Sequence, residues 1–196
     1  MSAFEFFFGF YGLILGLAVV EIIGGFSRVL KAGRLTALGL CLPLLALYVL
    51  LDLIQFWVDT WSRHPEPNIN AGVLTVALAI AGIYYLAASL VFPARPEDTD
   101  FGDHYDRHKR WVAIASLLAS LLSGTVLPVL AGQPELVLRL ATPAVAGFLL
   151  LWAAPLVAIC FIRNRRINAA LLGWQCLFYL ILTFAEAISA VPDAAR

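Results

Sequence analysis

Charge is what this chain lacks most. Only 13% of its 196 residues are charged, and the formal net charge is zero, whereas about 25% of the residues of a soluble domain are charged. The chain also has no block of basic residues and no glycine-rich phosphate loop, so we expect no nucleic-acid partner. Because 62% of the residues are hydrophobic, we expect an integral membrane protein in contact with a lipid bilayer.

Lysine, histidine and cysteine are scarce, and their positions exclude several cofactors. Lys31 and Lys109 both fall in predicted connections, which excludes a retinal Schiff base within the membrane. His64, His104 and His108 also fall in connections, which disfavours a haem held by paired histidines. The three cysteines show no metal or redox spacing, and no common hydrolase motif is present. We therefore expect no cofactor, and the interpretation leans away from an enzyme.

Long apolar runs predict the architecture. A run of about 17 to 25 apolar residues can cross a hydrocarbon core of about 30 Å. Six segments qualify, at about 4–26, 35–61, 70–92, 111–131, 140–162 and 168–190. Their short polar connections predict an all-α polytopic membrane protein whose residues 1–196 form one bundle. The first segment lacks the basic flank and cleavage pattern of a signal peptide, so we expect it to be a permanent helix.

The distribution of Lys and Arg predicts the orientation. Ten basic residues fall after the first, third and fifth segments: Arg28, Lys31, Arg34, Arg95, Arg107, Lys109, Arg110, Arg163, Arg165 and Arg166. The other two connections contain only Arg63 and Arg139. Since basic loops stay in the cytoplasm, both termini are expected outside, and this bias suits a multi-pass protein of a cell inner membrane.

A stripe of polar residues interrupts the second apolar segment. Its spacings of four, three and four residues place the members on one helix face: Tyr48, Asp52, Gln55 and Asp59. Ionisable groups inside a membrane are costly, so they are functional hypotheses by default. Counted from Leu35 at 1.5 Å per residue, Asp52 lies about 24–26 Å along the helix, in the outer third of the membrane.

Other carboxyls are predicted at similar depth. Glu5 begins the first segment and Glu186 lies near the outer end of the sixth, where Tyr179 shares its stripe. The first, second and sixth helices are therefore expected to enclose an outward-facing cation or proton site, with Arg139 as an alternative charge partner that would make these acids structural. Glu21, near the cytoplasmic end of the first segment, is a more distant acid of this set.

Two histidines in the longest connection suggest a second, weaker candidate. His104 and His108 are four residues apart, so on a helix both imidazoles share one face. With a carboxylate they would supply ligands for zinc or another divalent ion. The alternative is a solvated amphipathic segment that leads into the next helix.

Paired features hint at an inverted repeat of three plus three helices. Pro43 corresponds to Pro143, and the segment that begins at Asn70 corresponds to the one that begins at Asn168. Such a repeat would favour a transporter or channel.

Three functional classes follow from these observations. The favoured interpretation is a channel or secondary transporter for a cation, proton or small solute that uses intramembrane carboxylates. The alternative is a structural or accessory membrane subunit that packs against a larger complex. An intramembrane enzyme ranks last because no pair of nucleophile and base is evident. A glycine-lined face on the first segment, with Gly9, Gly12 and Gly16, also suits a homo-oligomer.

Overall fold

A computed structural model describes residues 3–63, 70–140 and 142–189, without the side chains of residues 3–8, 10, 60–63, 139, 144 and 186–189. Helices account for 87% of the chain, and the described part contains no strand, which confirms the all-α prediction. The elements are α1 (Ala3–Lys31), η1 (Leu35–Ala37), α2 (Cys41–Arg63), α3 (Ala71–Val91), η2 (Pro96–Asp98), α4 (Phe101–Leu121), η3 (Leu122–Val126), α5 (Leu127–Leu130), α6 (Pro134–Arg139), α7 (Pro143–Phe161) and α8 (Arg165–Ser189).

Five helices of the described part are long and apolar enough to cross a membrane. Their apolar stretches are Tyr11–Lys31, Cys41–Asp59, Ala71–Val91, Phe101–Leu130 and Arg165–Ala185. The fourth of these is a continuous rod of α4, η3 and α5. Helix α7 has a shorter apolar stretch, Val145–Phe161, so the sixth crossing stays a prediction.

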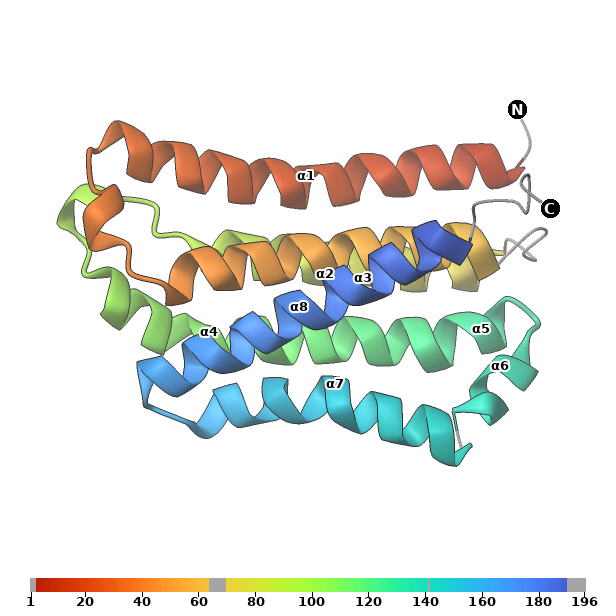
Figure 1. Ribbon diagram of the computed structural model, residues 1–196. Coiled ribbons are helices and arrows are strands. Elements are labelled where there is room, and N and C mark those ends of the chain that lie inside the picture. Colours follow the sequence, from red (N-terminus) through yellow and green to blue (C-terminus); the bar gives the residue numbers. More distant parts are fainter. Residues whose placement is uncertain (1–2, 64–69, 141, 190–196) are drawn as a thin grey trace.

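The helices form a bundle with α1 and α7 at opposite edges (Figure 1). Helix α1 packs mainly on α3, α3 also packs on α4, and α4 packs on α7. Helix α8 crosses α2 obliquely and packs on it. In an inverted repeat, α4 and α8 would correspond to α1 and α3 and would pack on each other in the same way. The described residues show no comparable packing of α4 on α8, so the packing gives the repeat no support. Asn70 and Asn168 also differ: Asn70 caps α3, whereas Asn168 lies inside α8.

Local sequence signals explain where several helices begin and end. Gly33 has φ +67 and ends α1, with its amide bound to the Leu30 carbonyl, because glycine adopts this left-handed conformation without strain. The Asn70 side chain accepts a hydrogen bond from the Val73 amide at 3.1 Å and donates to the Leu130 carbonyl at 2.8 Å. It therefore caps α3 and ties this helix end to α5.

Helix α4 begins ten residues before the predicted span. The Asp100 carboxylate accepts a hydrogen bond from the Asp103 amide at 2.8 Å, which caps the helix at Phe101. This amide holds the pKa of Asp100 below its ordinary value, because the hydrogen bond favours the charged form. The charged residues predicted in a connection, including His104 and Lys109, thus lie on the first turns of a long helix.

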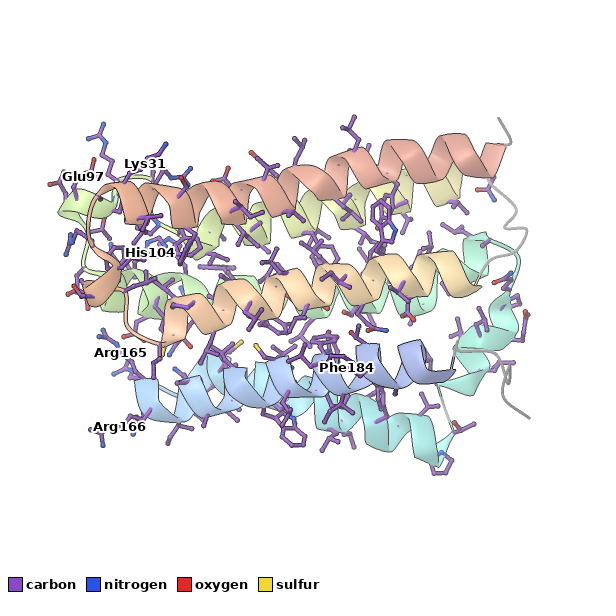
Figure 2. All side chains as sticks on the ribbon, turned by 45° about the horizontal axis from the view of Figure 1, so that its top comes forward. Lys31, Glu97, His104, Arg165, Arg166 and Phe184 are labelled. Carbon is purple, nitrogen blue, oxygen red and sulfur yellow. The ribbon has the colours of Figure 1, made fainter. Side chains whose placement is uncertain are left out.

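The end of the bundle that contains η1, η2 and the α7–α8 turn holds the basic residues. Figure 2 shows Lys31, Glu97, Arg165 and Arg166 at this end, which we call the basic end. The Arg34 guanidinium donates to the carbonyls of Pro96 and Glu97 at 2.8 and 2.7 Å. It thereby joins the α1–α2 connection to the α3–α4 connection.

A second set of contacts at the basic end joins α4 to α7 and α8. Arg165 forms ion pairs with Asp106 at 2.9 Å and Asp103 at 3.2 Å. Lys109 is only 5% exposed, and its ammonium donates to the Ile162 carbonyl at 2.6 Å while it lies 3.4 Å from Asp106. Charged hydrogen bonds are roughly twice as strong as neutral ones, so this end is firmly cross-linked.

Candidate functional site

The site is built around Asp52, which is the twelfth residue of α2 and 3% exposed. The predicted start of this helix near Leu35 was wrong, because α2 begins at Cys41, and the depth of Asp52 in a membrane stays a prediction. Asp52 therefore lies about 16 Å along the helix at 1.5 Å per residue, near its midpoint. The Tyr179 hydroxyl on α8 donates to the Asp52 Oδ1 at 2.6 Å. The predicted contact between the second and sixth apolar segments is thus present at their polar stripes.

Three more hydroxyl groups face the same carboxyl, from Tyr48, Tyr84 and Ser116. Helix α3 contributes Tyr84 and α4 contributes Ser116. The sequence predicted a site enclosed by the first, second and sixth helices, and it did not predict these contributions of α3 and α4. The second carboxylate oxygen, the Tyr48 hydroxyl and the Ser116 hydroxyl are fully buried. Buried polar groups usually have hydrogen-bond partners, and here the hydroxyls lie within hydrogen-bonding reach of the Asp52 carboxyl and hold it in place.

A chain of hydrogen bonds connects Asp52 to α7 and α8. The Trp152 indole on α7 donates to the Tyr179 hydroxyl at 2.7 Å, and this hydroxyl donates to Asp52. The Gln175 side chain donates to the Trp152 carbonyl at 2.9 Å. Each member orients the next, so the Tyr179 hydroxyl is committed as a donor to the carboxylate.

A cavity of about 260 Å³ lies beside Asp52. It follows α2 as far as Asp59 and also reaches Leu140, at the end of α6. Its wall consists of Asp52, Gln55, Phe56, Asp59, Tyr84, Ser120, Ser123, Gly124, Leu140, Phe148, Leu149, Trp152, Phe178, Tyr179 and Leu182. Two of these side chains are carboxylates, and no Lys, Arg or His is among them. The predicted stripe residues Gln55 and Asp59 therefore share one cavity with Asp52 and Tyr179.

A π-helical turn widens α4 beside the cavity. This turn, η3, includes Ser123 and Gly124, which line the wall one turn beyond Ser120. Such turns insert an extra residue into an α-helix and occur frequently at functional sites. Here the turn contributes two small residues to the cavity wall.

The remaining acids predicted for the site have separate outcomes. Glu21 forms an ion pair with Arg28 at 3.0 Å and does not line the cavity. Glu5, Glu186 and Arg139 lie on α1, α8 and α6, but their side chains lie outside the described part of the chain. Their roles as site residue and charge partner stay predictions.

The two histidines lie side by side at the start of α4. Their ring centroids are 4.2 Å apart, as expected for positions four residues apart on a helix. The His104 Nε2 lies 3.1 Å from the Leu90 carbonyl, and the His108 Nδ1 lies 2.8 Å from the His104 carbonyl. No cluster of three metal-ligating side chains occurs among the residues that the structure describes, so the metal site gains no third ligand there.

Sequence reasoning missed Tyr84, Ser116, Ser120, Ser123 and Trp152. One signal was available: Ser116, Ser120 and Ser123 follow spacings of four and three residues, the same pattern that revealed the stripe on α2. Tyr84 and Trp152 carry no such signal, because single aromatic residues are common in apolar helices.

This arrangement can attract and hold positive charge. A carboxylate at the middle of the bundle, several hydroxyls and a second carboxylate lie in one cavity without a basic side chain on its described wall. The buried Asp52 carboxylate, in surroundings of low dielectric constant, favours a cation or a proton. Comparisons of the chain with protein-family models, with curated proteins and with solved structures found no match.

Proposed function

We propose that this protein is a small channel or secondary transporter for a cation or proton, with Asp52 as the residue that carries the exchangeable charge. The observation that supports the proposal most strongly is the state of its carboxyl group. It is buried at mid-helix, faces four hydroxyl groups, forms no ion pair with a described basic side chain, and borders a cavity.

The energetic argument favours function over structure. A charged side chain at the middle of a spanning helix costs about 2.5–3.5 kcal/mol on insertion scales. A carboxyl kept only for stability is expected to be fully paired, because an unpaired buried group adds a further penalty. Asp52 is held by hydroxyl groups and forms no ion pair with a described basic side chain, which suits a group whose charge is balanced by a bound ion or proton.

The cavity and the basic end together suit an outward-facing state. The cavity extends toward α6, whereas the cross-linked basic end lies on the other side of Asp52. By the distribution of Lys and Arg, the basic end lies in the cytoplasm of a cell with an inner membrane, and α1 begins and α8 ends outside. A carrier must also reach the opposite state by rearranging its helices.

The proposal is tested by flux through the purified full-length chain in liposomes. Gradients of H⁺ and Na⁺ are imposed separately, and a pH-sensitive or Na⁺-sensitive dye is enclosed. We expect flux that Asp52→Asn reduces at least about tenfold, since the neutral amide keeps the size of the side chain but not its charge. Glu97→Gln, an exposed carboxyl at the basic end, is the matched control and retains the wild-type rate.

Equal elution and helical content of the variants show that folding is preserved. Flux by Asp52→Asn at the wild-type rate contradicts the role of Asp52. The absence of flux under every gradient, with a stoichiometric protein that co-purifies, overturns the transport proposal.

That last result would favour the second candidate, an accessory subunit. Its supporting observation is an apolar groove of about 400 Å³ between α1 and α2, lined by Gly12, Leu15, Gly16, Val19, Leu53, Ile54, Trp57 and Val58. Small residues on such a surface allow another helix to approach closely.

A further inference from the structure

The wall of the cavity indicates which class of cation it takes. Six of its side chains are aromatic: Phe56, Tyr84, Phe148, Trp152, Phe178 and Tyr179. They come from α2, α3, α7 and α8, so rings flank the Asp52 carboxyl from different sides of the bundle. From this juxtaposition we infer that the cavity binds a small organic ammonium ion, with the cationic nitrogen at Asp52 and its alkyl groups against the rings. This inference rests on the proposed function, because it names the cargo of that same site.

The rings of the cavity wall form two groups, one from α2 and α3 and one from α7 and α8. Phe56 and Tyr84 lie with their centroids 5.6 Å apart on the α2–α3 side. Phe148 and Phe178 lie 5.1 Å apart on the α7–α8 side, and Phe178 meets Tyr179 edge to face at 6.1 Å. Aromatic faces attract cations within about 6 Å, most strongly where water is excluded. Surfaces of this kind recognise quaternary and other organic ammonium groups.

The negative charge of the cavity wall is the second feature that favours an organic ammonium ion. Asp52 and Asp59 line the cavity, and no basic side chain does so among its described lining. The Asp52 carboxyl is 3% exposed and lies in the cavity wall, where the Tyr179 hydroxyl donates to its Oδ1. The carboxylate therefore supplies negative charge at this part of the cavity, and the hydrogen-bonded tyrosine fixes the group in place.

The same wall is a poor match for a hard divalent ion. Hard divalent cations such as Ca²⁺ take six to eight oxygen ligands at short distances, whereas the surface beyond Asp52 consists mainly of rings and aliphatic side chains. An organic ammonium ion carries its own apolar surface, so the rings replace its hydration shell. Ser120, Ser123 and Gly124 are small, which leaves room for its alkyl groups.

The test measures binding directly, separately from flux. The purified full-length chain in detergent is titrated with choline, with its neutral isostere 3,3-dimethylbutan-1-ol, and with NaCl at equal ionic strength. Tryptophan fluorescence and thermal stability report binding, since Trp152 lies in the cavity wall. We expect saturable binding of choline, and no saturable signal from the neutral isostere or from Na⁺.

Two pairs of variants sharpen this test. Phe178→Leu removes a ring from the cavity, and Phe184→Leu removes an aromatic ring that is 65% exposed on the same helix. We expect Phe178→Leu to weaken choline binding by roughly three- to tenfold and Phe184→Leu to leave it unchanged. Asp52→Asn is expected to weaken it at least about tenfold, and Glu97→Gln to have no effect. If Asp52→Asn does not fold, the Phe178→Leu and Phe184→Leu pair still decides the question.

The outcomes separate this inference from the proposed function. Flux of H⁺ or Na⁺ that depends on Asp52, without choline binding, keeps the proposed function and overturns the organic cargo. Saturable choline binding without any flux keeps the binding site and overturns transport. Equal binding of choline and its neutral isostere, or equal losses in Phe178→Leu and Phe184→Leu, also overturns the inference.

Discussion

Polar groups are used differently at the basic end and in the half of the bundle that surrounds Asp52. At the basic end, charged side chains are paired: Arg165 with Asp103 and Asp106, Arg34 with backbone carbonyls, and buried Lys109 with the Ile162 carbonyl. Around Asp52, the carboxylate faces four hydroxyl groups, and no basic side chain lies in the described wall of its cavity. Paired charges hold helices together, whereas a buried carboxylate without a described basic partner next to a cavity attracts a cation.

This difference is also one of packing. The basic end joins the α1–α2, α3–α4 and α7–α8 connections by contacts between residues far apart in the sequence. The other half contains the π-helical turn η3 and the cavity that extends toward α6. We therefore expect substitutions at the basic end to change stability more than transport, and substitutions in the cavity to do the opposite.

Lys109→Met is expected to lower stability more than the other substitutions at the basic end. Methionine keeps an apolar stem but loses the charged hydrogen bond to Ile162 and the ion pair with Asp106. A hydrogen bond to a charged group contributes about 1.5–3 kcal/mol, so the free energy of unfolding is expected to fall by that amount. It is measured by SDS titration in mixed micelles.

Lys31→Met is the matched control, because Lys31 is exposed at the same end. Its expected change is within about 0.5 kcal/mol. Equal losses in the two variants would break the comparison, since buried and exposed lysines would then contribute alike.

A smaller effect is expected from Asp100→Ala, which removes the cap of α4. At neutral pH the variant is expected to melt below the wild type, because the Asp103 amide loses its acceptor. The pKa of Asp100 is lowered in the folded state. Its stabilisation is therefore complete above the ordinary value of about 3.9 and is lost as the pH falls through the folded value.

Melting curves of wild type and Asp100→Ala at several pH values check this prediction. The difference between their melting temperatures should shrink only in the acidic range. A difference that stays constant down to low pH would show that the carboxylate charge does not contribute to the cap.

Spacing alone predicted much of the site. The pattern of Tyr48, Asp52, Gln55 and Asp59 identified the face of α2 that meets the cavity, and Tyr179 was placed in the facing stripe of α8. Apolar runs predicted an all-α membrane protein because a bilayer requires long uninterrupted helices. These features are local or periodic, so a single sequence contains them.

The rest depends on tertiary packing. The contributions of Tyr84 and Ser116 arise because α3 and α4, and not α1, adjoin Asp52, and no periodicity specifies which helices are neighbours. The predicted start of the second helix was wrong because it included η1 and the turn before Cys41. The early start of α4 was not predicted, because the first turns of this helix are charged, although Asp100 is a recognisable cap residue.

From the contrast between the two ends we expect that the cavity beside Asp52 opens to water at the α6 side and is closed at the basic end. Side-specific thiol labelling tests this claim. Cys41, Cys160 and Cys176 are replaced by alanine, and single cysteines are introduced as Ser123→Cys in the cavity wall, Glu135→Cys on α6 and Glu97→Cys at the basic end. A membrane-impermeant thiol reagent is then added to one side of oriented vesicles.

We predict that Ser123→Cys reacts from the same side as Glu135→Cys, that Glu97→Cys reacts only from the other side, and that choline slows the reaction at position 123 alone. Reaction of Ser123→Cys only from the side of Glu97→Cys would contradict the account. So would a failure of Ser123→Cys to react from either side while both control positions are labelled.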